Sequence, residues 1–107
     1  MKGSYLGELE EIVLLTIGIL DGDGYGVRVR KELAEQLDRS ISLSALHTVM
    51  HRLEKKGFLS SSLGEATKER GGKRKRIFEI TAIGRKALEE SKENRERMWH
   101  LMPKITD

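Results

Sequence analysis

The sequence contains no cysteine, a single proline and few aromatic residues (5%). The absence of cysteine excludes disulfides, thiolate nucleophiles and cysteine-ligated zinc sites. Long apolar runs are also lacking, because the longest, from Ile12 to Leu20, is only half of the roughly 20 residues that a membrane-spanning helix needs. This run follows Glu8, Glu10 and Glu11, whereas a signal peptide begins with basic residues. We therefore expect a cytoplasmic protein.

The charge of the chain is high in total but nearly balanced. Of the 107 residues 35% are charged, and the net charge is +3. The positive charge is concentrated between residues 68 and 76, where one acid, Glu69, faces six cationic residues. These are Lys68, Arg70, Lys73, Arg74, Lys75 and Arg76. Such a cluster is either a solvated loop or a surface for an anionic partner.

The first periodic segment predicts a helix from Glu8 to Leu20. Its apolar residues follow the i, i+3, i+4 spacing of a helical face, and others lie off that face. A helix that is apolar on more than one side must be covered on more than one side. A single domain of this length covers one side, so we expect a second copy of the chain to contact Leu9, Val13 and Ile17.

The second predicted helix runs from Tyr25 to Leu37. Asp23 is its expected N-cap, after the segment 21–24 has ended the first helix. Val29, Leu33 and Leu37 form its inward face. Tyr25, at its start, is expected to pack against the next helix or the base of the β-ribbon that follows; the alternative is a phosphate contact through its hydroxyl.

The third predicted helix begins after an N-cap at Ser42 and ends at Gly57. Its apolar face consists of Leu46, Val49, Met50 and Leu53. The opposite face carries only polar or positively charged side chains: Ser44, His47, Thr48, His51, Arg52 and Lys55. Such a face is suited to hydrogen bonding with a polar, anionic partner.

Two strands and a long helix complete the chain. The runs from Phe58 to Leu63 and from Arg76 to Thr81 are rich in apolar and β-branched residues, and the segment Gly64 to Lys75 joins them as a long loop. Thr81 is the expected N-cap of a last helix that reaches Met102, before Pro103. This helix is so heavily charged that it needs support from another element or another subunit.

The order of these elements predicts a helix-turn-helix, in which the third helix enters the major groove of double-stranded DNA. The candidate DNA-binding residues on this helix are Ser42, Ser44, His47, Thr48, His51, Arg52 and Lys55. The loop and second strand add Lys68, Arg70, Lys73, Arg74, Lys75 and Arg76, whose charges would contact phosphates.

Four segments of the sequence together resemble one family. They are LGELEEIVLLTIGIL, GYGVRVRKEL, SLSALHTVMHRLEKKGFL and ERGGKRKRIFEITAIGRKAL, which lie in this order between Leu6 and Leu88. In sequence and spacing they are similar to the PadR-like transcriptional regulators. His47 differs from the family, which commonly has tyrosine in this helix, so the resemblance does not extend to the operator sequence.

The resemblance implies a mainly α-helical winged helix-turn-helix fold with a two-stranded β-wing and a long C-terminal dimerisation helix. Residues 1–81 would form the DNA-binding region and residues 82–107 the dimerisation helix, within one continuous domain. Ser42 to Lys56 would be the recognition helix and Gly64 to Lys75 the wing tip. The implied function is a repressor that binds a pseudo-palindromic operator as a homodimer and is released by a small aromatic effector.

In this interpretation the dimer interface adds Leu88, Met98, Trp99 and Met102 from the last helix. Trp99 and Met98 are also candidate effector-binding residues, because Trp99 could anchor the interface, form the wall of a ligand cavity, or do both.

Other classes of protein fit the sequence less well. His47 and His51 have the spacing of a metal-binding pair, but the sequence offers no third ligand nearby, and we expect no metal or other cofactor. The chain has no nucleophile with a partner base and no phosphate-binding glycine motif, so we expect no enzyme. The alternative is a winged-helix module for protein interaction or non-specific DNA binding, without an effector.

Overall fold

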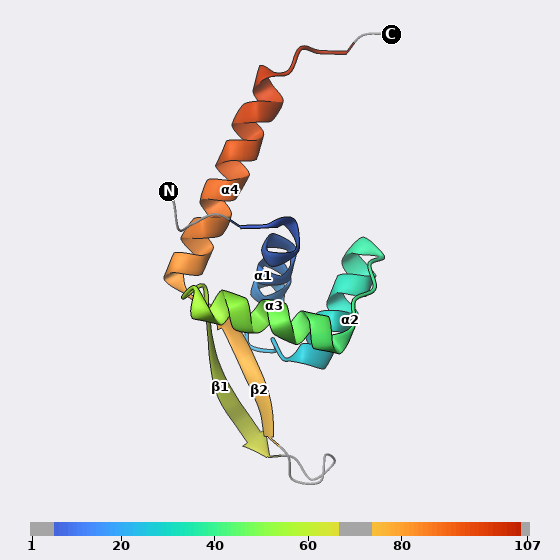
Figure 1. The fold of residues 1–107 in the computed structure, drawn as a ribbon, viewed down its shortest axis with the longest axis vertical. Coiled ribbons are helices and arrows are strands. Elements are labelled where there is room, and N and C mark those ends of the chain that lie inside the picture. The colour runs from blue at the N-terminus through green and yellow to red at the C-terminus, as the bar shows by residue number, and fades with distance from the viewer. Residues whose placement is uncertain (1–5, 67–73, 106–107) are drawn as a thin grey trace.

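The computed structural model describes residues 6–66 and 74–105. It contains the helices α1 (Glu8–Leu20), α2 (Gly26–Leu37), α3 (Leu43–Lys55) and α4 (Ala82–Leu101), and the strands β1 (Leu59–Ala66) and β2 (Arg74–Ile80). The two antiparallel strands form a ribbon between α3 and α4 in the chain. The molecule is elongated, 58 × 33 × 21 Å, because α4 and the ribbon extend in opposite directions from the body formed by α1, α2 and α3 (Figure 1).

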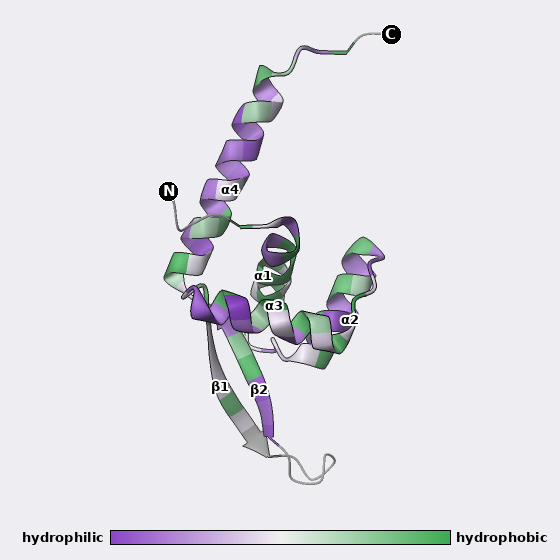
Figure 2. Cartoon of the chain, in the orientation of Figure 1, coloured by the Kyte–Doolittle hydropathy of each residue, from purple (hydrophilic) through white to green (hydrophobic). Residues whose placement is uncertain are grey.

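Helix α1 forms the centre of the fold. Val13, Leu14 and Ile17 are buried in the core, and α1 contacts α2, α3, α4 and β2. Figure 2 shows α1 as one of the most hydrophobic segments. The expectation that Val13 and Ile17 contact a second subunit is corrected, because their side chains are enclosed within the single chain. The apolar side chains that α1 exposes are instead Leu15 and Ile19, at 47% and 60%.

Helix α2 begins one residue later than expected, at Gly26. Tyr25, and not Asp23, occupies its N-cap position, without a side-chain cap. The chain is extended before this point because Gly24 accepts a hydrogen bond through its carbonyl from the Phe78 N–H of β2, at 2.9 Å. Val29 and Leu33 are buried as expected. Leu37 is 51% exposed, because it lies in the last turn, beyond the core.

Helix α3 agrees with the sequence pattern. Ser42 is its N-cap, and the Ser42 Oγ accepts a hydrogen bond from the Ala45 N–H at 3.1 Å. The four predicted apolar residues, Leu46, Val49, Met50 and Leu53, are all buried. The polar face of α3 is therefore directed away from the core.

The strands of the ribbon are longer than predicted. Pairing runs from Leu59 with Ile80 to Ala66 with Arg74, so the two ends of the expected loop Gly64 to Lys75 belong to the strands. The register shifts between Leu63 and Ala66, opposite Lys75. A shift of this kind is a β-bulge, which bends the bulged strand and increases its twist.

Helix α4 begins after Thr81, which accepts a hydrogen bond from the Gly84 N–H at 3.0 Å as expected of an N-cap. Only the first part of α4 packs on the body, where Gly84 and Ala87 are buried. Farther along, Arg95 forms an ion pair with Glu11 of α1. Trp99 and Leu101 near the end of the helix are 69% and 76% exposed.

A buried carboxylate joins α1 to the end of α3. Glu10 is 6% exposed, and its oxygens accept hydrogen bonds from Lys56 Nζ at 2.8 and 3.0 Å and from the Gly7 N–H at 2.9 Å. Burial raises the pKa of Glu10, but the hydrogen bonds from Lys56 and Gly7 and the charges of Lys56 and Arg52 outweigh burial. The pKa therefore lies below its usual value of 4.5.

We predict that Glu10→Gln lowers the free energy of unfolding at neutral pH by about 1–3 kcal/mol, since a buried hydrogen-bonded charge is lost. A carboxyl whose pKa is lowered by folding stabilises the protein above its unfolded value of 4.5 and loses that contribution as the pH falls through the folded value. Below pH 4.5 the wild type should therefore lose stability more steeply than the variant.

The measurement is urea unfolding at a fixed protein concentration over a pH series. Glu35→Gln is the matched control, because it removes an exposed carboxylate of α2. Equal pH profiles for the wild type and Glu10→Gln would contradict the assignment.

Candidate nucleic-acid interface

The exposed face of α3 is made of short polar side chains and imidazoles. Ser44, His47, Thr48 and His51 are all exposed along it. The Thr48 hydroxyl donates to the Ser44 carbonyl at 3.2 Å, so its lone pairs remain available to accept from a ligand. Since the opposite face is fixed in the core, this face stays directed outward.

The ribbon brings the cations of β2 next to this helix. A cleft of about 440 Å³ lies between the start of α2, α3 and β2. It is lined by Tyr25, Gly26, Val27, Leu43, His47, His51, Arg74, Lys75, Arg76 and Phe78. Five of the predicted site residues, from two separate elements, therefore meet at one cleft.

Two histidines of α3 pack against the neighbouring elements at this cleft. The His51 ring packs edge-on against Phe78 of β2, with the ring centroids 6.0 Å apart. The His47 ring lies so close to the first turn of α2 that a Cβ atom at Gly26 would be 2.7 Å from Nε2. The two imidazoles, whose centroids are 6.4 Å apart, thus connect α3 to the ribbon and to α2.

A chain of polar contacts holds the ribbon at the C-terminal turn of α3. Arg76 Nη1 donates to Ser61 Oγ at 3.0 Å, and the Ser61 hydroxyl donates to Glu54 Oε2 at 2.6 Å. His51 Nδ1 lies 3.9 Å from the other oxygen of Glu54. Glu54 therefore positions both elements and partly offsets the positive charge of Arg76.

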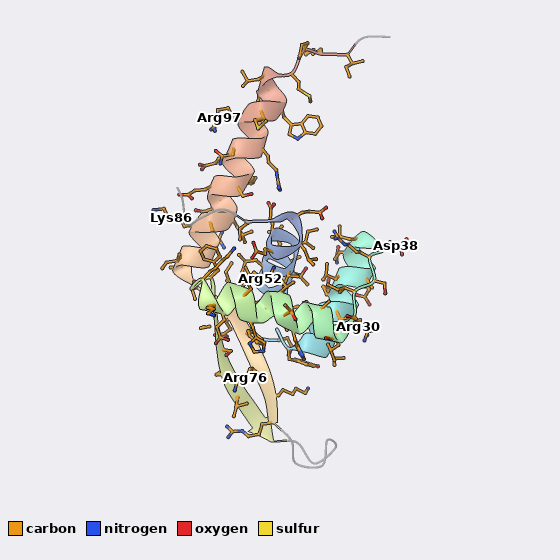
Figure 3. All side chains as sticks on the ribbon, in the orientation of Figure 1. Arg30, Asp38, Arg52, Arg76, Lys86 and Arg97 are labelled. Atoms are coloured by element: carbon orange, nitrogen blue, oxygen red, sulfur yellow. The ribbon has the colours of Figure 1, made fainter. Side chains whose placement is uncertain are left out.

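Some predicted site residues have other contacts in the structure. Arg52 Nη1 lies 3.9 Å from the buried Glu10, and Figure 3 shows Arg52 between α3 and α1 while Arg76 lies on the ribbon. The Ser42 hydroxyl caps α3. Arg74 donates through Nε to the Gly64 carbonyl at 2.7 Å. Lys55 is exposed at the last residue of α3.

Part of the predicted basic cluster, Lys68, Arg70 and Lys73, lies outside the described residues. Tyr25, for which the sequence favours packing over a phosphate contact through its hydroxyl, lines the cleft. Glu54 is a site residue that the sequence does not predict, because nothing in it indicates that an acid would lie beside the cations of β2.

The other predicted surface lies at the opposite end of the molecule. A groove of about 780 Å³ separates α1 from α4 and is lined by Leu15, Ile19, Leu88 and Trp99, with charged residues around them. Leu9 and Leu88 are half-buried against the core, whereas Met98 and Met102 are 66% and 52% exposed. The groove thus contains two of the residues predicted from α4, Leu88 and Trp99. Its apolar residues from α1 are Leu15 and Ile19, which are not the residues of α1 that the sequence predicted.

Two further properties bear on the class of protein. Within residues 6–66 and 74–105, no three His, Asp or Glu side chains are grouped as a metal site would require. None of the described helices is long and apolar enough to span a membrane.

The arrangement of α2, a short turn, α3 and a two-stranded ribbon is a winged helix-turn-helix, a class of DNA-binding fold. The model of the transcriptional regulator PadR-like family matches residues 14–90. The chain therefore belongs to this family, whose members are transcription regulators and not enzymes. The family resemblance and fold class expected from the sequence are confirmed.

Solved structures agree with this assignment. A transcriptional regulator from Clostridium thermocellum is 29% identical, with 84% of each chain covered and a TM-score of 0.68. A PadR family transcriptional regulator from Eggerthella lenta is 26% identical, with 87% of this chain and 80% of that chain covered and a TM-score of 0.69.

F93 from STIV, a winged-helix DNA-binding protein, shares the fold at 22% identity, with 88% of this chain and 94% of that chain covered and a TM-score of 0.69. No curated protein sequence matches the chain.

We predict that Arg74→Ala combined with Arg76→Ala weakens binding to operator and random DNA alike. Two lost phosphate contacts should reduce the slope of log affinity against log salt by about 1–2. Thr48→Ala should instead weaken operator binding about tenfold and leave random DNA nearly unaffected, because base contacts carry sequence preference.

Fluorescence anisotropy titrations at several salt concentrations provide the measurement. The control is Lys86→Ala with Arg97→Ala, which removes two positive charges from α4, the helix that extends away from the ribbon (Figure 3). Equal losses on both kinds of DNA for Thr48→Ala would contradict its role in sequence preference.

Proposed function

We propose that this protein is a homodimeric transcriptional repressor that binds a pseudo-palindromic operator in the cytoplasm and is released by a small aromatic effector. One observation supports the proposal of DNA binding: side chains from the polar face of α3 and the cations of β2 line the same cleft. The α3 side chains would read base edges, and Arg74, Lys75 and Arg76 would neutralise phosphates beside them.

A dimer explains the surplus apolar surface at the two ends of the chain. Trp99, Leu101 and Met102 are more than half exposed near the end of α4, and Leu15 and Ile19 are exposed on α1. Side chains of this size rarely remain in water as a group on a monomer. We propose that α4 of one subunit packs along α1 and α4 of its partner and covers both sets.

A two-fold axis would place two recognition helices on one face of the DNA. Successive major grooves on one face are about 34–36 Å apart, so the operator should consist of two half-sites separated by one helical turn. Each half-site would be contacted by one α3 and one ribbon.

The groove between α1 and α4 supports the effector part of the proposal. Its 780 Å³ falls in the range of small-molecule pockets, roughly 300–1,000 Å³, and it combines the Trp99 indole with Leu15, Ile19 and several charged groups. A planar aromatic compound would stack on Trp99 where α4 meets the partner.

Selection of genomic fragments by the purified protein, followed by sequencing and gel-shift titration at two salt concentrations, tests the DNA-binding part. We expect a recurrent inverted repeat, two protomers per site, and affinity that falls steeply with salt. Affinity that is equal for all fragments would support a non-specific module instead, and no shift on any fragment at low salt would overturn the proposal.

We predict that Trp99→Ala raises the dissociation constant of the dimer about tenfold or more, because a large aromatic anchor is lost. Sedimentation equilibrium measures this, with Val27→Ala of the exposed α2 surface as the control. An unchanged oligomeric state would exclude Trp99 from the interface.

The single tryptophan also reports on the effector. Its fluorescence should change on addition of a planar aromatic compound that also releases DNA. No change across a panel of such compounds would remove the effector from the proposal.

A further inference from the structure

The three cations of β2 at the cleft differ in their contacts with the rest of the chain. Arg76 donates to Ser61, which is linked to Glu54, and Arg74 donates to the carbonyl of Gly64. Both guanidinium groups are therefore partly occupied in holding the ribbon. Lys75, between them, faces a different kind of partner.

The Lys75 ammonium lies over the ring of Tyr25, with Nζ 4.0 Å from the ring centroid. The face of an aromatic ring attracts a cation by its quadrupole without taking up a conventional hydrogen bond. The N–H donors of the ammonium that point away from the ring thus remain suited to an anion. The contact also connects β2 to the first turn of α2, since Tyr25 is the N-cap residue of that helix.

The surroundings of this pair favour an anion. Arg74 and Arg76 contribute further positive charge to the cleft, and His47 contributes a ring nitrogen from α3. The cleft opens beside the exposed face of α3, because His47 and His51 are both exposed and line it. An anion bound here would therefore lie at the edge of whatever α3 contacts.

We propose that this cleft seats one particular phosphate of the DNA backbone in each half-site, held by the Lys75 ammonium and the Tyr25 hydroxyl. This inference rests on the proposed function and adds a defined phosphate subsite to it. Phosphate contacts of this kind fix the register and orientation of a protein on the duplex. Because the subsite joins α2 to the ribbon, it would hold the ribbon at a fixed position relative to α3.

The test replaces each phosphate of a selected operator half-site in turn by a neutral methylphosphonate. For the wild type we expect several sensitive positions, and at the phosphate bound by Lys75 affinity should fall about tenfold or more, the loss typical of a charge-assisted hydrogen bond. Lys75→Gln should lose a similar factor on unmodified DNA and lose most of its sensitivity to methylphosphonate at that position, where the Tyr25 hydroxyl still makes its contact. Sensitivity at all other positions should persist.

Tyr25→Phe separates the two parts of the pair. It keeps the ring under Lys75 but removes the hydroxyl, so it should reduce the sensitivity at the same position without abolishing it. Lys86→Gln, which removes an exposed charge from α4, is the control and should leave the whole pattern unchanged. Circular dichroism and thermal melting check that each variant is folded.

The outcomes distinguish this inference from the proposed function. If the wild type binds no DNA, both are overturned. If the wild type binds its operator but Lys75→Gln keeps sensitivity at every position, or loses it evenly at all of them, the phosphate subsite alone is overturned. Binding of adenosine monophosphate to the DNA-free protein that Lys75→Gln abolishes, with an unaltered methylphosphonate pattern, would assign the cleft to a free nucleotide and overturn the assignment to DNA.

Discussion

The packing of α1 against the other elements is the interaction on which the rest of the structure depends. Val13, Leu14 and Ile17 lie in the core, and α2, α3, α4 and β2 all contact this helix. Burial of one such side chain stabilises a fold by about 1.5–3 kcal/mol. The whole apolar face of α3 packs on this core. The polar face of α3 is therefore held toward the outside of the molecule.

Two adjacent carboxylates near the start of α1 add directional contacts to this packing. Glu10 binds Lys56 at the end of α3, and Glu11 forms an ion pair with Arg95 of α4. Neighbouring residues of one helix thus contact the end of α3 and the middle of α4. The positions of α3 and α4 are stabilised by contacts one residue apart.

The candidate interface carries less uncompensated positive charge than its sequence indicates. Arg52 lies beside Glu10, and Arg76 is linked through Ser61 to Glu54, so both charges are partly offset within the chain. Lys75 keeps the donors that point away from Tyr25, because its partner is the face of an aromatic ring. A site with a few uncommitted cations at defined places favours particular phosphates over general attraction to polyanions.

The local features of the sequence were sufficient to predict most of the elements. The start and apolar face of α3 and the start of α4 agree with the prediction, because a capping hydroxyl and an i, i+3, i+4 pattern act within a few residues. The start of α2 differed, since Gly24 is extended by its pairing with Phe78, a residue far along the chain. The strands were longer than their apolar runs, because pairing continues through polar residues.

The sequence by itself determined the winged helix-turn-helix order and the polar face of α3, since periodicity and caps depend on neighbouring residues. It did not determine which side of α1 is interior, because that helix is apolar on several sides and its pattern is compatible with more than one choice. Only the tertiary structure decided that Val13 and Ile17 are core residues, that Leu15 and Ile19 remain exposed, and that Tyr25 meets Lys75. These outcomes depend on contacts between segments far apart in the chain, which no local pattern contains.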